Sequence, residues 1–328
     1  MLNIINNSTN PYFNLALEEY LLKIDASQAD KLILWQNAPT IVVGKNQNTL
    51  EEINYQYVKE YHIHVVRRLT GGGAVYHDPG NLNFSFIISL GNFPKTDFSV
   101  FAEPIIYCLA NLGIKAEFDG RNDITVEGKK FSGNAQCFYR DKLLHHGTIL
   151  FDSDLNMLGK ALKPKKNYVS KAVKSVQSRV TNLKKYLPAD LTVQIFQQLL
   201  ARSIFAYHNR PYLEYVLTEA DLSRVNQLAA AKYSTWEWNF GSSPVFNFQK
   251  ALTFTGGNLT LNLNISQGLV KDCKIYGDFF EHKPVEELET LLTGQRYEET
   301  NLQSLLEKVD VSRYISGLTL QQLLTCLF

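Results

Sequence analysis

The spacing of apolar side chains changes repeatedly along the chain, from a helical period to a strand period and back. Residues 11–24 and 98–114 carry apolar side chains at helical intervals. Residues 82–90, LNFSFIISL, have the composition and length of a strand, and three strand-like runs separated by turn residues follow between residues 123 and 151. We therefore expect helices mixed with a strand meander.

The second half of the chain divides into a helical part and a strand-rich part. Residues 188–231 have a mostly helical period, whereas three alternating runs between residues 250 and 280 predict strands, followed by two short amphipathic helices. We expect two domains, residues 1–245 and 246–328. Because the elements form hairpins and helices rather than repeated strand–helix–strand units, the pattern favours an α+β fold with a mixed, largely antiparallel sheet.

The composition is that of an ordinary globular protein and narrows the classes of partner. Of the 328 residues, 45% are hydrophobic and 20% are charged, and the formal net charge of +1 provides no overall field for nucleic acid or a membrane. The four cysteines are scattered without CxxC spacing, which fits a reducing compartment, and the first residues lack the pattern of a signal peptide. We expect a cytoplasmic protein that binds neither nucleic acid nor a membrane.

The stretch RRLTGGGAVYHDPGNLNFSF, residues 67–86, contains three consecutive glycines after a predicted strand. A glycine triplet costs conformational entropy, so it is expected where the backbone turns sharply or a ligand lies against the main chain. Exposed main-chain N–H groups bind phosphate or carboxylate oxygens, and a guanidinium adds a two-pronged contact. Arg67 and Arg68 alternate across the strand, so only one faces the loop. An anion site and a plain glycine-rich turn with a surface arginine both remain open.

A lysine in the predicted meander is a second candidate for contact with an anion. In the strand KKFSGNA, alternation places Lys130 and Ser132 on one face and Lys129 and Phe131 on the other. If Phe131 packs in the core, Lys130 faces the opposite side. Gly133 leaves room for a ligand beside the strand, and HHGT supplies polar residues on the next strand. The alternative is a solvated lysine at the edge of a hairpin.

Residues 160–185 form a strongly basic segment. They hold nine lysine and arginine residues and no acidic residue, although the whole chain is nearly neutral. Such a segment is either a solvated face or a mobile lid that closes over a polyphosphate or meets an acidic partner.

Four motifs in a fixed order carry a resemblance to a known family. They are RRLTGGGAVYHDPGNLNFSF, DITVEGKKFSGNAQ, HHGTILFDSDLNMLGKAL and KSVQSRVTNL. Together they resemble the lipoate–protein ligases, of the single-chain bacterial type with a C-terminal accessory domain, over essentially the whole chain. The resemblance implies a catalytic domain like those of biotin protein ligases and class II aminoacyl-tRNA synthetases, followed by a small α+β domain.

The resemblance also implies an activity and its partners. Members of the family activate lipoate with ATP and Mg²⁺ to lipoyl-AMP. They then transfer the lipoyl group to one lysine of a lipoyl domain, either in the E2 subunit of a 2-oxoacid dehydrogenase or in the glycine-cleavage H protein. A mixed anhydride with AMP gives the carboxylate a good leaving group, and fixed cations offset the repulsion between the two anions that react.

Site residues follow from the same resemblance, motif by motif. The lysine that touches both the lipoyl carboxyl group and the α-phosphate corresponds to Lys130. The ATP contacts correspond to Arg68, Gly73, Ala74, Val75 and Tyr76. The lipoate contacts, besides Lys130, correspond to Gly72, His146 and Gly147. The adenylate loop corresponds to Ser175, Ser178 and Arg179. For Asp123, the residue pattern leaves open a Mg²⁺ ligand and a turn-capping carboxylate.

Two rival functions remain open at this point. A cysteine-dependent lipoyl or octanoyl transferase shares the glycine loop and the lysine but carries the acyl group on a thiol, and Cys137 follows Lys130 closely. The adenylate-loop motif and the C-terminal domain favour the ligase. A non-catalytic lipoate-binding protein is the second rival, and the intact Lys130 speaks against it. Release of pyrophosphate distinguishes the ligase from the transferase.

Overall fold

The computed structural model describes residues 1–47, 49–92, 97–119, 122–162, 179–240, 248–266, 268–297 and 299–328. The chain forms two compact units. The first unit consists of Met1–Val42, Leu50–Val66 and Val75–Asn239. The second consists of Val43–Thr49, Arg67–Ala74 and Phe240–Phe328. The predicted boundary between residues 245 and 246 lies outside the described residues, so it stays a prediction.

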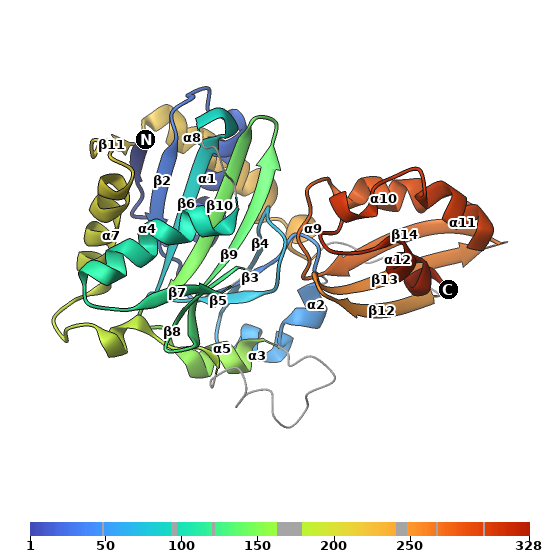
Figure 1. Cartoon of the computed structure of the whole chain (residues 1–328), viewed down its shortest axis with the longest axis horizontal. Coiled ribbons are helices and arrows are strands. Elements are labelled where there is room, and N and C mark those ends of the chain that lie inside the picture. Colours follow the sequence, from blue (N-terminus) through green and yellow to red (C-terminus); the bar gives the residue numbers. More distant parts are fainter. Residues whose placement is uncertain are drawn as a thin grey trace. The chain divides into compact units, whose positions relative to one another are not determined.

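An eight-stranded sheet forms the centre of the first unit (Figure 1). In spatial order its strands are β11 (Glu214–Val216), β1 (Leu2–Ile5), β2 (Lys31–Trp35), β6 (Asn81–Ser89), β10 (Lys142–Leu150), β9 (Lys129–Tyr139), β8 (Asp123–Val126) and β7 (Ala116–Asp119). Strand β1 is parallel to β2 and to β11, and the other neighbouring pairs are antiparallel. The expected mixed, largely antiparallel sheet is therefore confirmed. A smaller sheet has the order β4 (His64–Arg67), β3 (Thr40–Val43) and β5 (Val75–His77).

Helices lie against both faces of the large sheet. The helices before residue 240 are α1 (Pro11–Glu19), α2 (Thr49–Glu52), α3 (Tyr55–Glu60), α4 (Phe98–Asn111), α5 (Leu155–Ala161), α7 (Val193–Tyr207), α8 (Glu219–Leu228) and α9 (Trp236–Asn239). Helices α4 and α7 share one apolar core with the sheet, and α4 crosses that face in Figure 1. Helix α1 lies against the opposite face, where Ser85 of β6 donates a hydrogen bond to Glu18. Because both faces are covered, β6 is buried over almost its whole length.

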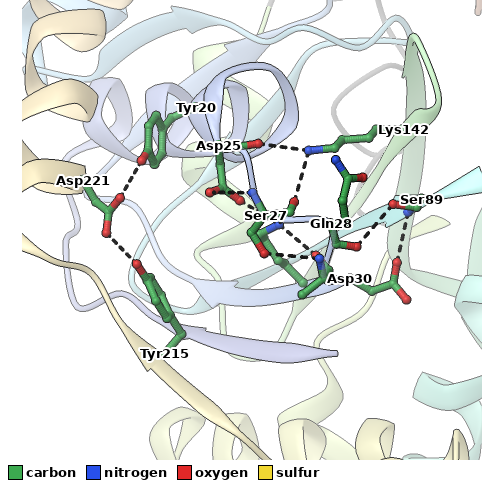
Figure 2. Close-up of polar contacts among 11 residues, drawn as sticks. Tyr20, Asp25, Ser27, Gln28, Asp30, Ser89, Lys142, Tyr215 and Asp221 are labelled. Atoms are coloured by element: carbon green, nitrogen blue, oxygen red, sulfur yellow. Dashed lines mark hydrogen bonds and ion pairs between the residues drawn. The ribbon is translucent and has the colours of Figure 1, made fainter.

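A polar network joins α1 to two later elements of the first unit, α8 and β11 (Figure 2). Helix α1 continues as a π-helical turn, Tyr20–Ile24, and the Tyr20 hydroxyl donates to the Asp221 carboxylate of α8, as does the Tyr215 hydroxyl of β11. Asp221 also forms a capping box with Thr218 at the start of α8. Strand β11 falls inside residues 188–231, predicted to be mostly helical; it escapes detection because it is three residues long and largely exposed at the sheet edge.

The second unit contains the small C-terminal α+β fold that the sequence predicts. Strands β12 (Phe248–Phe254), β13 (Gly257–Ser266) and β14 (Leu269–Gly277) form an antiparallel sheet. Helices α10 (Val285–Leu292), α11 (Glu299–Leu306) and α12 (Leu320–Leu327) share its apolar core. Within the described residues of both units, no helix is long and apolar enough to cross a membrane.

Candidate active site

Strand β9 positions Lys130 through an irregularity in its pairing with β8. Ser132 lies opposite Ile124, but Lys130 lies opposite Thr125, so Phe131 is an extra residue between the two pairs. Phe131 is fully buried in the core, and Lys130 faces the other side, as predicted. The predicted sharing of a face by Lys130 and Ser132 is wrong, because Ile124 and Thr125 are successive residues of β8 and point to opposite faces.

Lys130 forms one wall of a pocket of about 370 Å³ in the first unit. Its ammonium lies 2.7 Å from Oδ1 of Asp123, and the two side chains are 37% and 31% exposed. Gly133 makes room for this ion pair, since a Cβ atom there would lie 2.7 Å from the Lys130 Nζ atom. The residues that line the pocket are Asp119, Asp123, Thr125, Gly128, Lys130, Arg179 and Val180.

The end of the predicted adenylate loop is tied to the backbone of the lysine. Val180 forms a parallel bridge with Lys130, and the Thr181 N–H donates to the Lys130 carbonyl at 2.8 Å. Arg179 therefore lines the same pocket as Lys130. Ser175 and Ser178, with most of the basic segment, lie outside the described residues, so their predicted roles stay predictions.

A row of polar side chains continues from the pocket along the face of the sheet that α1 covers. His146 of β10 pairs across the sheet with Ala135 of β9 and with Ser85 of β6. The Glu18 carboxylate, 1% exposed, lies 2.9 Å from the His146 Nδ1 atom and accepts a hydrogen bond from Ser85. Ser85 in turn accepts from the Trp35 indole N–H at 2.8 Å. Gly133 and Ala135 of β9 share this face because strand residues alternate. The Lys130 ammonium lies over Gly133, so Lys130 is on the same face as His146.

Sequence reasoning missed Glu18, Ser85 and Trp35, although two of them left a signal. Ser85 interrupts the apolar run FSFII, and Glu18 follows the apolar residues Leu15, Ala16 and Leu17 of the predicted helix. A buried polar side chain requires a partner, so polar residues at core positions of a helix and a strand indicate a shared network.

Gly147 faces the opposite side of the sheet from His146, so only His146 lies in this row. A Cβ atom at Gly147 would lie 2.4 Å from the Phe84 ring and 2.5 Å from the Asn134 Oδ1 atom. His145 also lies on that side, stacked on Phe101 with a ring distance of 4.3 Å. Its pKa is well below the ordinary value, because burial disfavours the charged ring. The role of Gly147 as a lipoate contact stays a prediction.

The two arginines before the glycine triplet hold two different loops of the second unit. The Arg67 guanidinium donates to the carbonyl oxygens of Gly44, Lys45 and Gln47 at 2.6–3.0 Å. Burial lowers the pKa of Arg67 to about 10. The Arg68 guanidinium instead faces the glycine loop, which agrees with the expected alternation.

Arg68 is 5% exposed and clamps the loop that follows it. Its Nη2 group donates to the carbonyl oxygens of Gly71 and Gly73 at 2.6 and 2.9 Å, and its Nε group donates to Thr70 at 2.9 Å. The contact of Arg68 with ATP stays a prediction.

The glycine triplet allows a close approach of two backbone segments within the second unit. The Gly72 N–H donates to the Phe279 carbonyl at 3.1 Å, and a Cβ atom at Gly71 would lie 2.3 Å from that oxygen. Gly72 has a φ of +89°, a conformation that other residues rarely adopt. The Lys45 ammonium pairs with the Glu281 carboxylate beside this contact. The loop thus needs glycine for its turn and for close packing against the main chain.

The remaining predicted ATP contacts follow the triplet. Gly73 and Ala74 belong to the second unit, whereas Val75 and Tyr76 belong to β5 in the first. Tyr76 is 3% exposed and pairs with Ile41 of β3, and burial raises its pKa to about 12. Contacts of these residues with ATP stay predictions.

The described part of the chain contains no group of three or more His, Cys, Asp or Glu side chains arranged to hold a metal ion. Asp123 is the first residue of β8, and Oδ1 of its carboxylate faces the Lys130 ammonium, so the Mg²⁺ ligand and the turn cap both stay predictions. Cys137 lies on β9 opposite Leu144 and is partly exposed. Cys137 is not among the described residues that line the pocket around Lys130.

Two family models match most of the chain. Residues 10–205 match the lipoyl protein ligase A/B catalytic domain, and residues 243–327 match the bacterial lipoate protein ligase C-terminus. Lipoate-protein ligase LplJ of Bacillus subtilis is 44% identical over 333 residues, covering 100% of both chains.

Solved structures show the same fold. LipL1 of P. falciparum in complex with lipoate is 30% identical with a TM-score of 0.81, covering 94% of each chain. A bipartite lipoate protein ligase of Thermoplasma acidophilum, described with its E2 lipoyl domain, is 29% identical with a TM-score of 0.67, over 75% of this chain and 98% of that one. Lipoate-protein ligase A bound with ATP is 28% identical with a TM-score of 0.64, over 73% and 98%. The chain therefore belongs to the lipoate–protein ligases, an enzyme family.

Proposed function

We propose that this enzyme activates lipoate with ATP to lipoyl-AMP and then transfers the lipoyl group to a lysine of a lipoyl domain. The observation that carries the proposal is the position of Lys130. Its ammonium lines a pocket at one face of the large sheet. On the same face, Ala135, His146 and Ser85 lie side by side on neighbouring strands and are buried. A carboxylate held near Lys130 can extend its aliphatic tail along that row.

The chemistry of the first step requires positive charge at this place. The lipoate carboxylate attacks the α-phosphate, the bond from that phosphorus to the bridging oxygen breaks, and pyrophosphate leaves. Two anions must approach each other, and a fixed ammonium stabilises the charge that develops between them. Lys130, positioned by the β9 irregularity and by Thr181, supplies that ammonium.

In the second step the ε-amine of the acceptor attacks the lipoyl carbonyl carbon, and AMP leaves. Relatives solved with lipoate, with ATP and with an E2 lipoyl domain support these three reactants for this chain. Acceptors of the H-protein type follow from the family resemblance. We propose that Mg²⁺ enters with ATP as part of the substrate, and that the reaction takes place in the cytoplasm.

Transfer to an acceptor tests the proposal directly. The purified protein is incubated with lipoate, ATP, Mg²⁺ and a purified unmodified lipoyl domain, and the mass of the acceptor is measured. We expect one lipoyl group per acceptor and none when the acceptor lysine is changed to arginine. In a parallel reaction, the lipoyl group is supplied on a donor protein or as a thioester, without nucleotide. Modification there would contradict the proposal and favour a transferase whose Cys137 thiol takes the acyl group from that donor, and a Cys137→Ser variant would then abolish it.

A further inference from the structure

Lys130 has two oxygen groups to contact in the proposed adenylation, the lipoyl carboxylate and the α-phosphate. An ammonium carries three N–H donors on a flexible stem, so its direction must be fixed by other groups. This inference rests on the proposed function and concerns what fixes that direction.

The backbone of Lys130 is held on both sides. On one side Lys130 pairs with Thr125 of β8, and on the other it pairs with Val180 and accepts from the Thr181 N–H. The four-carbon stem is therefore the part of the residue that remains to be directed.

Asp123 and Gly133 direct the stem. Gly133 lies opposite Asp123 in the strand register, and its missing side chain is the space that the Lys130 ammonium occupies. The ammonium lies 2.7 Å from Oδ1 of Asp123, an oxygen that is buried from solvent. The contact is an ion pair without an aligned hydrogen bond to Oδ1 in the described part of the chain. An ammonium has three N–H donors, so a contact with one carboxylate oxygen leaves donors for substrate oxygens.

We propose that Asp123 is a positioning residue, which holds the Lys130 ammonium over Gly133 so that its N–H groups point at the lipoyl carboxylate and the α-phosphate together. The carboxylate acts by charge and the glycine acts by leaving space. Neither residue needs to touch a substrate for this role.

This assignment differs from a Mg²⁺ ligand at Asp123. A Mg²⁺ ion on Oδ1 would lie beside the ammonium, and the two cations would repel each other. Magnesium in nucleotide sites is usually held by one or two carboxylates and by substrate phosphates. The observed ion pair therefore favours a partner for Lys130 over a metal ligand.

Asp123→Asn and Asp123→Ala test the carboxylate. The assay is ATP–pyrophosphate exchange with lipoate, over a range of Mg²⁺ concentrations. We expect kcat to fall about 10-fold for Asn and up to about 100-fold for Ala, the size of effect that small misplacements of catalytic groups produce. The KM for lipoate and the Mg²⁺ concentration for half-maximal rate should stay within about two-fold. Glu117→Gln on β7, an exposed carboxylate paired with Lys115, is the matched control and should behave as wild type.

Gly133→Ala tests the space without removing any charge. The added Cβ would meet the end of a flexible side chain, so the ammonium should move while the fold stays intact. We expect an unchanged or slightly higher melting temperature together with a loss of kcat of about 10-fold or more.

A double-mutant cycle tests whether Asp123 acts through Lys130. In a Lys130→Leu background, Asp123→Asn should cause no further change in lipoate affinity, measured by calorimetry, or in residual exchange. Full activity of Asp123→Asn, additive losses in the cycle, or a raised Mg²⁺ requirement would each overturn the proposal. A wild-type protein without lipoate-dependent exchange would instead refute the proposed function itself.

Discussion

At the scale of single residues, two of the predicted substrate contacts, Lys130 in the first unit and Arg68 in the second, are each held by neighbours within their own unit. Lys130 lies against Asp123, and Arg68 lies against the carbonyl oxygens of its own loop. Such fixed charges need little rearrangement during reaction, which is the condition for effective electrostatic catalysis. The same contacts make the site sensitive to substitutions that keep charge but change geometry.

Substitutions of Arg68 test the clamp on the glycine loop. Arg68→Ala should raise the KM for ATP at least 10-fold and the KM for lipoate much less, because the lipoate row lies on other elements. Arg68→Lys should recover little, since an ammonium cannot reach two carbonyl oxygens and Thr70 together. Initial rates of pyrophosphate exchange measure both constants. Equal losses for the two substrates would count against the clamp.

At the scale of elements, the sequence predicted that Phe131 packs in the core and that Lys130 faces the other side of the sheet, and the structure has this arrangement. The aromatic ring decides it, because burial of a large apolar side chain outweighs the local pairing of the strand. The pattern of alternation failed at Ser132, because the extra residue in β9 leaves no mark in the sequence. It also missed β11, whose pairing with β1 depends on distant residues rather than on local preference.

The junction of α1, α8 and β11 yields a prediction for stability and its pH dependence. Burial tends to raise the pKa of Asp221, but hydrogen bonds from Tyr20, Thr218 and Tyr215 outweigh burial and lower its pKa to about 2. A lowered pKa means that the charged carboxylate stabilises the fold above pH 4, and that this stabilisation is lost as the pH falls through about 2.

Asp221→Asn should therefore lower the free energy of unfolding by about 1–2 kcal/mol near neutral pH, the usual value of a helix cap and its hydrogen bonds. The difference from wild type should shrink between pH 4 and pH 2. Urea unfolding at several pH values measures it, with Glu219→Gln in the same helical turn as the control. A difference that stays constant down to pH 2 would show that the charge is not responsible.

At the scale of the whole molecule, the glycine loop belongs to the same compact unit as the C-terminal fold. The sequence predicted a division at residues 245 and 246, which assigns Val43–Thr49 and Arg67–Ala74 to the catalytic domain. In the structure these two segments belong to the compact unit of the C-terminal fold. Sequence could not reveal this, because the joining contacts are backbone hydrogen bonds such as Gly72 to Phe279, which any residue with an N–H can make.

A cavity in the C-terminal core should therefore affect the use of ATP. Leu306 of α11 is fully buried, and Leu306→Ala should cost about 2–5 kcal/mol of stability. We expect the KM for ATP to rise while lipoate affinity stays near wild type, because His146 and Trp35 belong to the first unit. Calorimetric binding of each substrate checks this. Lipoate affinity that falls as much as ATP affinity would show that the two units do not respond separately.

The central claim is that Lys130 brings the lipoate carboxylate and ATP together without a covalent enzyme intermediate. The most direct measurement is ATP–pyrophosphate exchange, with and without lipoate, for the wild-type protein, Lys130→Leu and the neighbouring control Lys129→Met. We predict exchange that requires lipoate, falls at least about 100-fold in Lys130→Leu and persists in Lys129→Met. Exchange that is absent in the wild type, or undiminished in Lys130→Leu, would contradict the account.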